Sequence, residues 1–151
     1  MNWTYLKEEI TSIDQFPKDI MGFVYILTHL PSKKVYVGKK FLVFTQKRKL
    51  AKRDLKAYEG QPGRKPKYKV VSKESDWKDY WSSNKEIKKL LEKEPKSNFT
   101  RQIVHLCKSK KQLTYFETKY QFLYEVLEKS DKFFNDNILG KFYYTDFGNI
   151  K

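Results

Sequence analysis

Two apolar segments on either side of a short turn decide the fold of this chain: Gly22-Phe23-Val24-Tyr25-Ile26-Leu27 and Lys34-Val35-Tyr36-Val37-Gly38. Both are rich in β-branched and aromatic residues, which favour strands. The turn between them is Leu30-Pro31-Ser32-Lys33, whose proline and serine are typical of a chain reversal. The sequence therefore predicts a β-hairpin made of two antiparallel strands.

The segments on both sides of this hairpin have weaker patterns. Residues 1–20 are expected to form a short leading segment with one or two helical turns. A basic helix is predicted over Thr45–Tyr58, with Gly60 as its stop signal. Residues Gly60–Ser75 contain two prolines and a further glycine among lysines, and this composition predicts a loop.

The second half of the chain predicts two capped helices and a third strand. One helix is expected over Asn84–Glu94, and the alternating segment Phe99–Cys107 indicates a central strand. Ser109-Lys110-Lys111-Gln112 has the spacing of a capping box and opens a long helix with an apolar stripe. The expected fold is α+β, a small three-stranded antiparallel sheet flanked by helices, with residues 21–151 forming one domain.

Composition limits the class of protein. The chain has 151 residues, of which 39% are hydrophobic and 17% aromatic, so it can bury a core without staples. Cys107 is the single cysteine and is expected to be a buried thiol, which excludes an internal disulfide. No signal peptide and no membrane span is visible, so we expect a cytoplasmic protein without a membrane partner. Nothing in the sequence specifies an oligomeric state.

Positive charge is concentrated in one part of the chain. The net charge is +14, and residues 33–73 contain fifteen Lys or Arg against two acids, a net +13. A solvated lysine-rich surface or an acidic membrane would also suit such a charge, but a nucleic acid fits best, because neutralised phosphates release counterions. The residues expected to bind it are Lys40, Lys47, Lys49, Lys52, Arg53, Arg64, Lys65, Lys67 and Lys69.

The hairpin also resembles a known family. Phe23-Val24-Tyr25, followed after ten residues by Tyr36-Val37-Gly38, resembles the paired triplets of the GIY-YIG nucleases, although Phe23 stands where the first triplet has Gly. The elements from Gly22 to Gly140 follow in the family's order, and Tyr115-Phe116-Glu117 is similar to a group of small phage-encoded members. The resemblance implies the GIY-YIG fold and a DNA endonuclease, a phosphodiester hydrolase found in the host cytoplasm if phage-encoded.

The same resemblance implies a metal site. Glu117 would hold one divalent ion, Mg²⁺ or Mn²⁺, which would stabilise the leaving oxygen as a Lewis acid. Without the resemblance, Glu117 would be interpreted as a solvated helix glutamate. Tyr25 is expected to accept the proton of the attacking water, with Tyr36 orienting water or phosphate and Lys39 lowering a tyrosine pKa. Core packing is the alternative for both tyrosines.

Two further residues are carried over from the family. Its helix arginine would fall on Gln46 here, so Arg48, two residues later, is expected to grip the scissile phosphate, with Arg53 as the second choice. Asn135 matches a late asparagine that supports the site. Trp77, Tyr80 and Trp81 are candidates either for base stacking or for packing onto the core. A non-catalytic nucleic-acid-binding module that keeps the fold is the alternative to an enzyme, and RNA is an alternative to double-stranded DNA.

Overall fold

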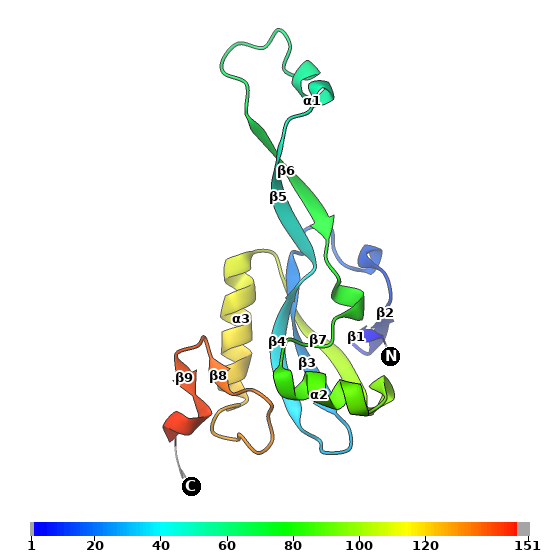
Figure 1. Cartoon of the computed structure of the whole chain (residues 1–151), viewed down its shortest axis with the longest axis vertical. Helices are drawn as coiled ribbons and strands as arrows, with labels where there is room; N and C mark the ends of the chain where they lie inside the picture. Colours follow the sequence, from blue (N-terminus) through cyan, green and yellow to red (C-terminus); the bar gives the residue numbers. More distant parts are fainter. Residues whose placement is uncertain (1, 148–151) are drawn as a thin grey trace. The chain divides into compact units, whose positions relative to one another are not determined.

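A computed structural model describes residues 2–147 and divides the chain into two units. Of these residues, 2–42 and 76–147 form the main unit, and 43–75 form the hairpin unit. The elements of both units are labelled in Figure 1.

The main unit is built on a mixed sheet of five strands in the order β2-β1-β7-β3-β4. β1 runs parallel to β7, whereas the other neighbouring strands are antiparallel. The central pair β3 and β4 confirms the predicted hairpin, and it leaves β4 at the edge of the sheet. The strands are β1 (Trp3–Tyr5), β2 (Glu8–Ile10), β3 (Gly22–His29), β4 (Val35–Phe41) and β7 (Phe99–Cys107).

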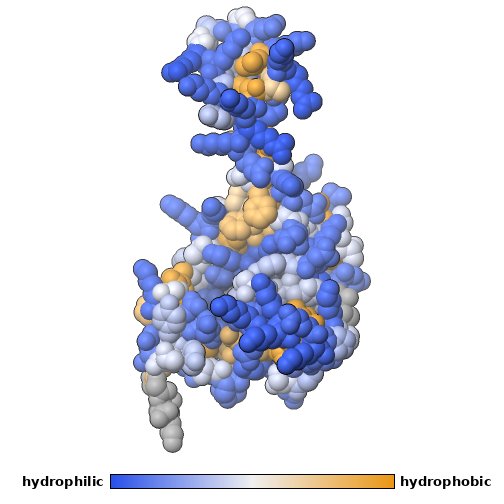
Figure 2. Space-filling view, in the orientation of Figure 1, coloured by the Kyte–Doolittle hydropathy of each residue, from blue (hydrophilic) through white to orange (hydrophobic). Residues whose placement is uncertain are grey.

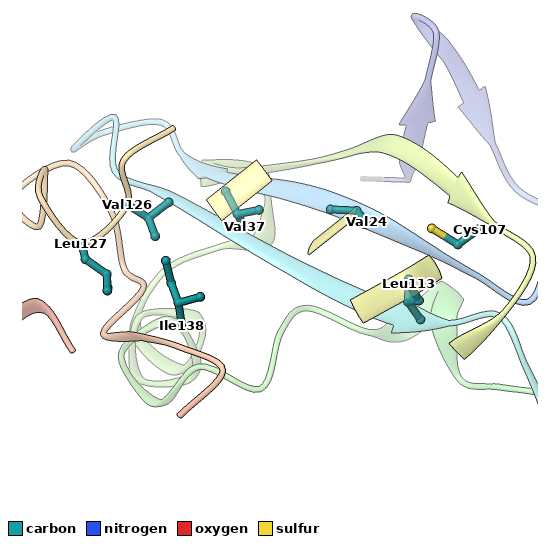
Figure 3. Packing of buried hydrophobic residues seen from close by; sticks show 7 residues of the cluster. All are labelled: Val24, Val37, Cys107, Leu113, Val126, Leu127 and Ile138. Carbon is teal, nitrogen blue, oxygen red and sulfur yellow. The ribbon is translucent and has the colours of Figure 1, made fainter. Parts of the chain in front are cut away.

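One face of the sheet is covered by α3 (Lys110–Leu123), which contacts β3, β4 and β7. This helix begins where predicted, because the Ser109 hydroxyl accepts the N–H of Gln112 at 3.2 Å. Strands, helix and the segment after it contribute to the core drawn in Figure 3: Val24, Val37, Cys107, Leu113, Val126, Leu127 and Ile138. Cys107 is fully buried there, as expected.

The opposite face carries an aromatic cluster. The Trp3 ring lies 5.0 Å from that of Phe23 and 5.3 Å from that of Tyr25. Trp77 is also fully buried, and its carbonyl accepts the Trp3 indole N–H at 2.7 Å. Trp77 is therefore a core residue. The remaining elements of this unit are η1 (Ile13–Gln15), η2 (Trp77–Asp79), α2 (Lys85–Lys93), η3 (Lys96–Asn98), β8 (Asn137–Ile138), β9 (Phe142–Tyr143) and η4 (Tyr144–Phe147).

The hairpin unit consists of the antiparallel strands β5 (Val43–Lys49) and β6 (Tyr68–Glu74), with the short helix α1 (Lys52–Lys56) between them. Figure 2 shows a largely hydrophilic surface on this unit, with an apolar patch near α1.

Three predictions about the fold were wrong. The basic helix over Thr45–Tyr58 is a strand and a five-residue helix, and the loop over Gly60–Ser75 contains β6. Because most side chains on β5 and β6 are exposed, they lack the apolar alternation that signals a half-buried strand. Residues 1–20 contribute β1 and β2 to the sheet, which therefore has five strands instead of three.

Candidate active site

The two tyrosines of the paired triplets lie on one face of the β3–β4 hairpin. Tyr25 is paired with Gly38, and Tyr36 is paired with Leu27, so the tyrosines are two register positions apart. Their ring centroids are 6.1 Å apart. A Cβ at Gly38 would lie 2.7 Å from the Tyr25 hydroxyl and 2.7 Å from Tyr36 Cε1. The hairpin therefore needs glycine at this position to bring the two rings together.

The two tyrosines differ in access to solvent. Tyr25 is 1% exposed and packs within the aromatic cluster, whereas Tyr36 is half-buried and lines a pocket. Burial raises the pKa of Tyr25 well above its ordinary value, and the neighbouring Tyr36 and Tyr80 add to this. Burial and the negative charge of Glu117 raise the pKa of Tyr36 to about 12. Both are therefore neutral phenols at neutral pH, and only Tyr36 can meet a ligand directly.

Glu117 projects from α3 towards the edge strand β4. Its side chain is 16% exposed, and Oε1 lies 3.8 Å from Lys39 Nζ. The same Nζ donates to the Thr114 hydroxyl at 3.0 Å, which fixes the ammonium against the helix. Burial raises the pKa of Glu117, and the charge and backbone N–H of Lys39 oppose the rise. A partly desolvated carboxylate is thus held beside a cation.

Asn135 holds the edge strand between Tyr36 and Gly38. Its Oδ1 accepts the Val37 N–H at 3.0 Å, and its Nδ2 donates to the Val37 carbonyl at 2.8 Å. Gln121 on α3 donates to the same carbonyl at 3.2 Å. Asn135 is 5% exposed, so both of its bonds are shielded from water. Asn135 therefore fixes the backbone of Val37, and its support of the site stays a prediction.

The pocket beside β4 has a volume of about 830 Å³. It is lined by carboxylate, phenol, amide and ammonium groups from β4, α2, α3 and the segment that follows α3. Residues on its wall include Lys34, Tyr36, Lys39, Lys85, Glu117 and Asn135. Four of the six predicted catalytic residues thus border one polar cavity. A fifth, Tyr25, does not line the cavity but packs against Tyr36, which does.

The chain matches the family model described as "Putative endonuclease segE, GIY-YIG domain" over residues 3–138. It belongs to this GIY-YIG family. The family is one of endonuclease domains, which indicates a nuclease and hence a nucleic-acid substrate. No curated protein and no solved structure gives a significant match. Within the described part of this GIY-YIG domain, no helix has the length and apolar character needed to cross a membrane.

The donor groups of the GIY-YIG pocket fit a hard cation with few protein ligands. Within residues 2–147, no three His, Cys, Asp or Glu side chains gather closely enough to hold a metal together. Mg²⁺ is usually bound by one or two carboxylates, with waters and substrate phosphates completing its octahedron. Glu117 supplies one such carboxylate at a polar cavity, and the Glu86 and Asp136 residues also line that cavity.

The sixth predicted catalytic residue of the GIY-YIG domain, Arg48, lies on β5 in the hairpin unit, where it is exposed and paired with Lys69. Arg53 lies on α1 of the same unit. The fourth arginine, Arg101, is buried in the main unit and donates to the carbonyls of Lys78 and Tyr80, so it has a structural role. The predicted nucleic-acid-binding residues Lys47, Lys49, Lys52, Arg53, Arg64, Lys65, Lys67 and Lys69 all lie in the hairpin unit.

Lys40 differs from the other predicted nucleic-acid-binding residues. It lies on β4 with its ammonium 4.1 Å above the Tyr80 ring, and it forms an ion pair with Asp76. Tyr80 contacts Tyr25, and Trp81 packs 3.9 Å from the Arg101 guanidinium. These aromatic residues therefore pack against the protein, which favours the core alternative over base stacking.

Sequence reasoning missed Ser82, which hydrogen-bonds to both tyrosines. Ser82 is 5% exposed and has φ 115°, a conformation that favours glycine. Its hydroxyl accepts the N–H of Asn84 at 3.0 Å. Burial raises the pKa of Tyr25 and of Tyr36, and hydrogen bonding to Ser82 opposes both rises. No sequence pattern predicts that a serine adopts this backbone conformation.

Proposed function

We propose that this GIY-YIG domain is a metal-dependent endonuclease that hydrolyses DNA phosphodiester bonds in the pocket beside β4. The observation that carries the proposal is that Tyr36, Lys39 and Glu117 line the same polar pocket. A partly buried carboxylate beside a phosphate-binding site costs free energy. A module that only binds nucleic acid would gain nothing from it. Double-stranded DNA is the substrate we propose, because the basic residues cluster on a two-stranded unit suited to a groove.

We assign the water-facing role to Tyr36 and a supporting role to Tyr25, the reverse of the expectation from sequence. Tyr25 is 1% exposed, so an attacking water has no access to its hydroxyl. The small fraction of Tyr36 that is ionised acts as the base: its phenolate oxygen accepts a hydrogen bond from the water and takes its proton as the water oxygen attacks phosphorus and the P–O bond to the leaving oxygen breaks. Ser83 hydrogen-bonds to this phenol and, against the effects of burial and Glu117, favours its ionised form. Tyr25 packs against Tyr36 and fixes its ring.

Lys39 and the pocket lysines Lys34 and Lys85 neutralise phosphate charge in this proposal. Glu117 holds the metal, and a bound Mg²⁺ or Mn²⁺ ion would supply Lewis-acid stabilisation of the leaving oxygen. Asn135 keeps β4 in place through the Val37 backbone. We retain Arg48 as the proposed phosphate clamp, because a planar guanidinium binds a phosphate through two parallel hydrogen bonds.

Relaxation of a supercoiled plasmid tests the proposal. The wild-type protein is expected to nick or linearise DNA in Mg²⁺ or Mn²⁺ and to stop in EDTA. Glu117→Ala should slow cleavage by about 100-fold or more, since metal stabilisation of charge is worth several kcal/mol. The control is Glu92→Ala, which removes an exposed glutamate of α2. DNA binding without cleavage in either metal would instead identify a non-catalytic module.

A further inference from the structure

The hairpin unit has two faces of different character. Side chains alternate along a strand, and directly paired residues of an antiparallel ribbon share a face. The register Lys47↔Val70 and Arg48↔Lys69 therefore assigns the residues to two sets. The Lys47 face contains Val43, Thr45, Lys47, Lys49, Tyr68, Val70, Ser72 and Glu74, and the Arg48 face contains Phe44, Gln46, Arg48, Lys69, Val71 and Lys73.

Helix α1 is joined to the Arg48 face by an ion pair. Lys69 Nζ lies 2.9 Å from Asp54 Oδ1, and Asp54 also accepts the Ala51 N–H at 2.8 Å. Lys69 and Val71 on this face are partly buried. Seven of the eight residues of the Lys47 face are exposed, including Val70 at 68% and Tyr68 at 54%, and Val43 is half-buried. The Lys47 face is therefore the more open side of the ribbon.

The chemistry of the Lys47 face fits the edges of base pairs as well as phosphates. The unit has eleven Lys or Arg against three acids, a net +8, which suits a polyanion. Lysines can donate to guanine edges, hydroxyls can bond to any base, and an exposed valine can contact the thymine methyl group. A face that bound only phosphates would have no use for Val70 and Tyr68 between its lysines.

The length and the two-stranded width of the ribbon favour B-form DNA over an RNA duplex as the partner of this face. The major groove of B-form DNA is about 12 Å wide and admits a two-stranded ribbon. A seven-residue strand spans about 20 Å, or roughly six base pairs at about 3.4 Å each. The deep, narrow major groove of an RNA duplex excludes such an element. We propose that the Lys47 face enters the DNA major groove and selects the sequence bound; this inference rests on the proposed endonuclease function.

Selection from a pool of duplex DNA with a randomised centre tests this inference with the full chain in EDTA, where cleavage is suppressed. Lys47→Ala/Val70→Ala is compared with Gln46→Ala/Lys73→Ala, a control on the Arg48 face that also removes one lysine. The wild type should enrich a motif of about six base pairs. The Lys47-face variant should lose the preference for that motif over a mismatched one by about 5- to 100-fold, and the control should keep it.

Three results would overturn the inference: no motif enriched by the wild type, a motif changed only by the control variant, or equal competition by duplex RNA. The endonuclease proposal has a separate readout, plasmid cleavage in Mg²⁺. A protein that cleaves DNA but enriches no motif would support the endonuclease proposal and contradict sequence selection by the Lys47 face. A protein that enriches a motif but does not cleave would support sequence selection and contradict the endonuclease proposal.

Discussion

The ammonium of Lys39 lies 3.8 Å from the carboxylate of Glu117, and this pair joins the edge strand β4 to α3 at the wall of the pocket. Although the cation is close, burial dominates and the pKa of Glu117 stays above its ordinary value. The fold therefore holds a carboxylate at the pocket whose negative charge is disfavoured, which is a usual property of functional sites.

Glu117→Gln should make the protein more stable at neutral pH. An acid whose pKa is higher in the folded state loses stability as pH rises from its unfolded to its folded value, because the unfolded chain ionises first. Glutamine has no such loss. The gain in free energy of unfolding, measured in urea, should be near zero at pH 3 and largest at pH 8. Glu92→Gln is the exposed control, and a lower stability of Glu117→Gln at pH 8 would contradict the desolvation argument.

Asn135→Ala should destabilise the fold by about 1–3 kcal/mol, because the Val37 N–H loses its partner in a buried place. Cleavage should also slow, since Val37 lies between Tyr36 and Gly38. Urea unfolding measures the first effect and single-turnover cleavage the second. Gln102→Ala, which removes an exposed amide on β7, should change neither. Full stability of Asn135→Ala would show that the bonds to Val37 are dispensable.

Ser82 should act through its hydroxyl. Ser82→Gly suits the backbone at φ 115° but removes the hydroxyl, whereas Ser82→Ala removes the hydroxyl and keeps the strain. Both variants should raise the pKa of Tyr36, followed by NMR of labelled tyrosine rings, and slow cleavage. If Ser82→Gly leaves the pKa and the rate unchanged, the role of Ser82 is only conformational.

The two arginine candidates should respond differently. If Arg48 grips the phosphate in the transition state, Arg48→Ala should abolish turnover with little loss of DNA affinity. Arg53→Ala should mainly weaken binding, and Arg48→Lys should restore little, because an ammonium lacks the planar fork. Single-turnover rates and affinities of all three variants decide this. Loss of chemistry in Arg53→Ala alone would reverse the roles.

Much of the fold is predictable from the apolar pattern. β3, β4, β7, α2 and α3 have strong periodicity and clear caps, and the structure has them close to the expected bounds. The strands of the hairpin unit are not predictable in this way, because a ribbon exposed on both faces lacks the alternation of apolar and polar residues that marks a strand. β1 was missed because a three-residue strand is fixed by its parallel pairing with β7, a contact that is distant in sequence.

The sequence predicts which residues form the candidate site better than it predicts the role of each residue. The paired triplets led to Tyr25, Tyr36 and Lys39, and the resemblance led to Glu117 and Asn135. Sequence could not tell which tyrosine faces the pocket, because both occupy one face of the hairpin and their difference lies in what packs over them. Trp3 and Tyr80 cover Tyr25, and both come from distant segments.

The most direct test of this account is the single-turnover rate of duplex DNA cleavage by Tyr36→Phe and Tyr25→Phe, measured side by side with enzyme in excess and Mg²⁺ present. A positioned proton acceptor contributes about 10²- to 10⁴-fold. Tyr36→Phe should therefore cleave at least about 100-fold more slowly than the wild type, with DNA affinity preserved. Tyr25→Phe should lose less than about 10-fold once the folded fraction is accounted for. The reverse order, a dead Tyr25→Phe and an active Tyr36→Phe, would contradict the assignment of the pocket beside β4 as the active site.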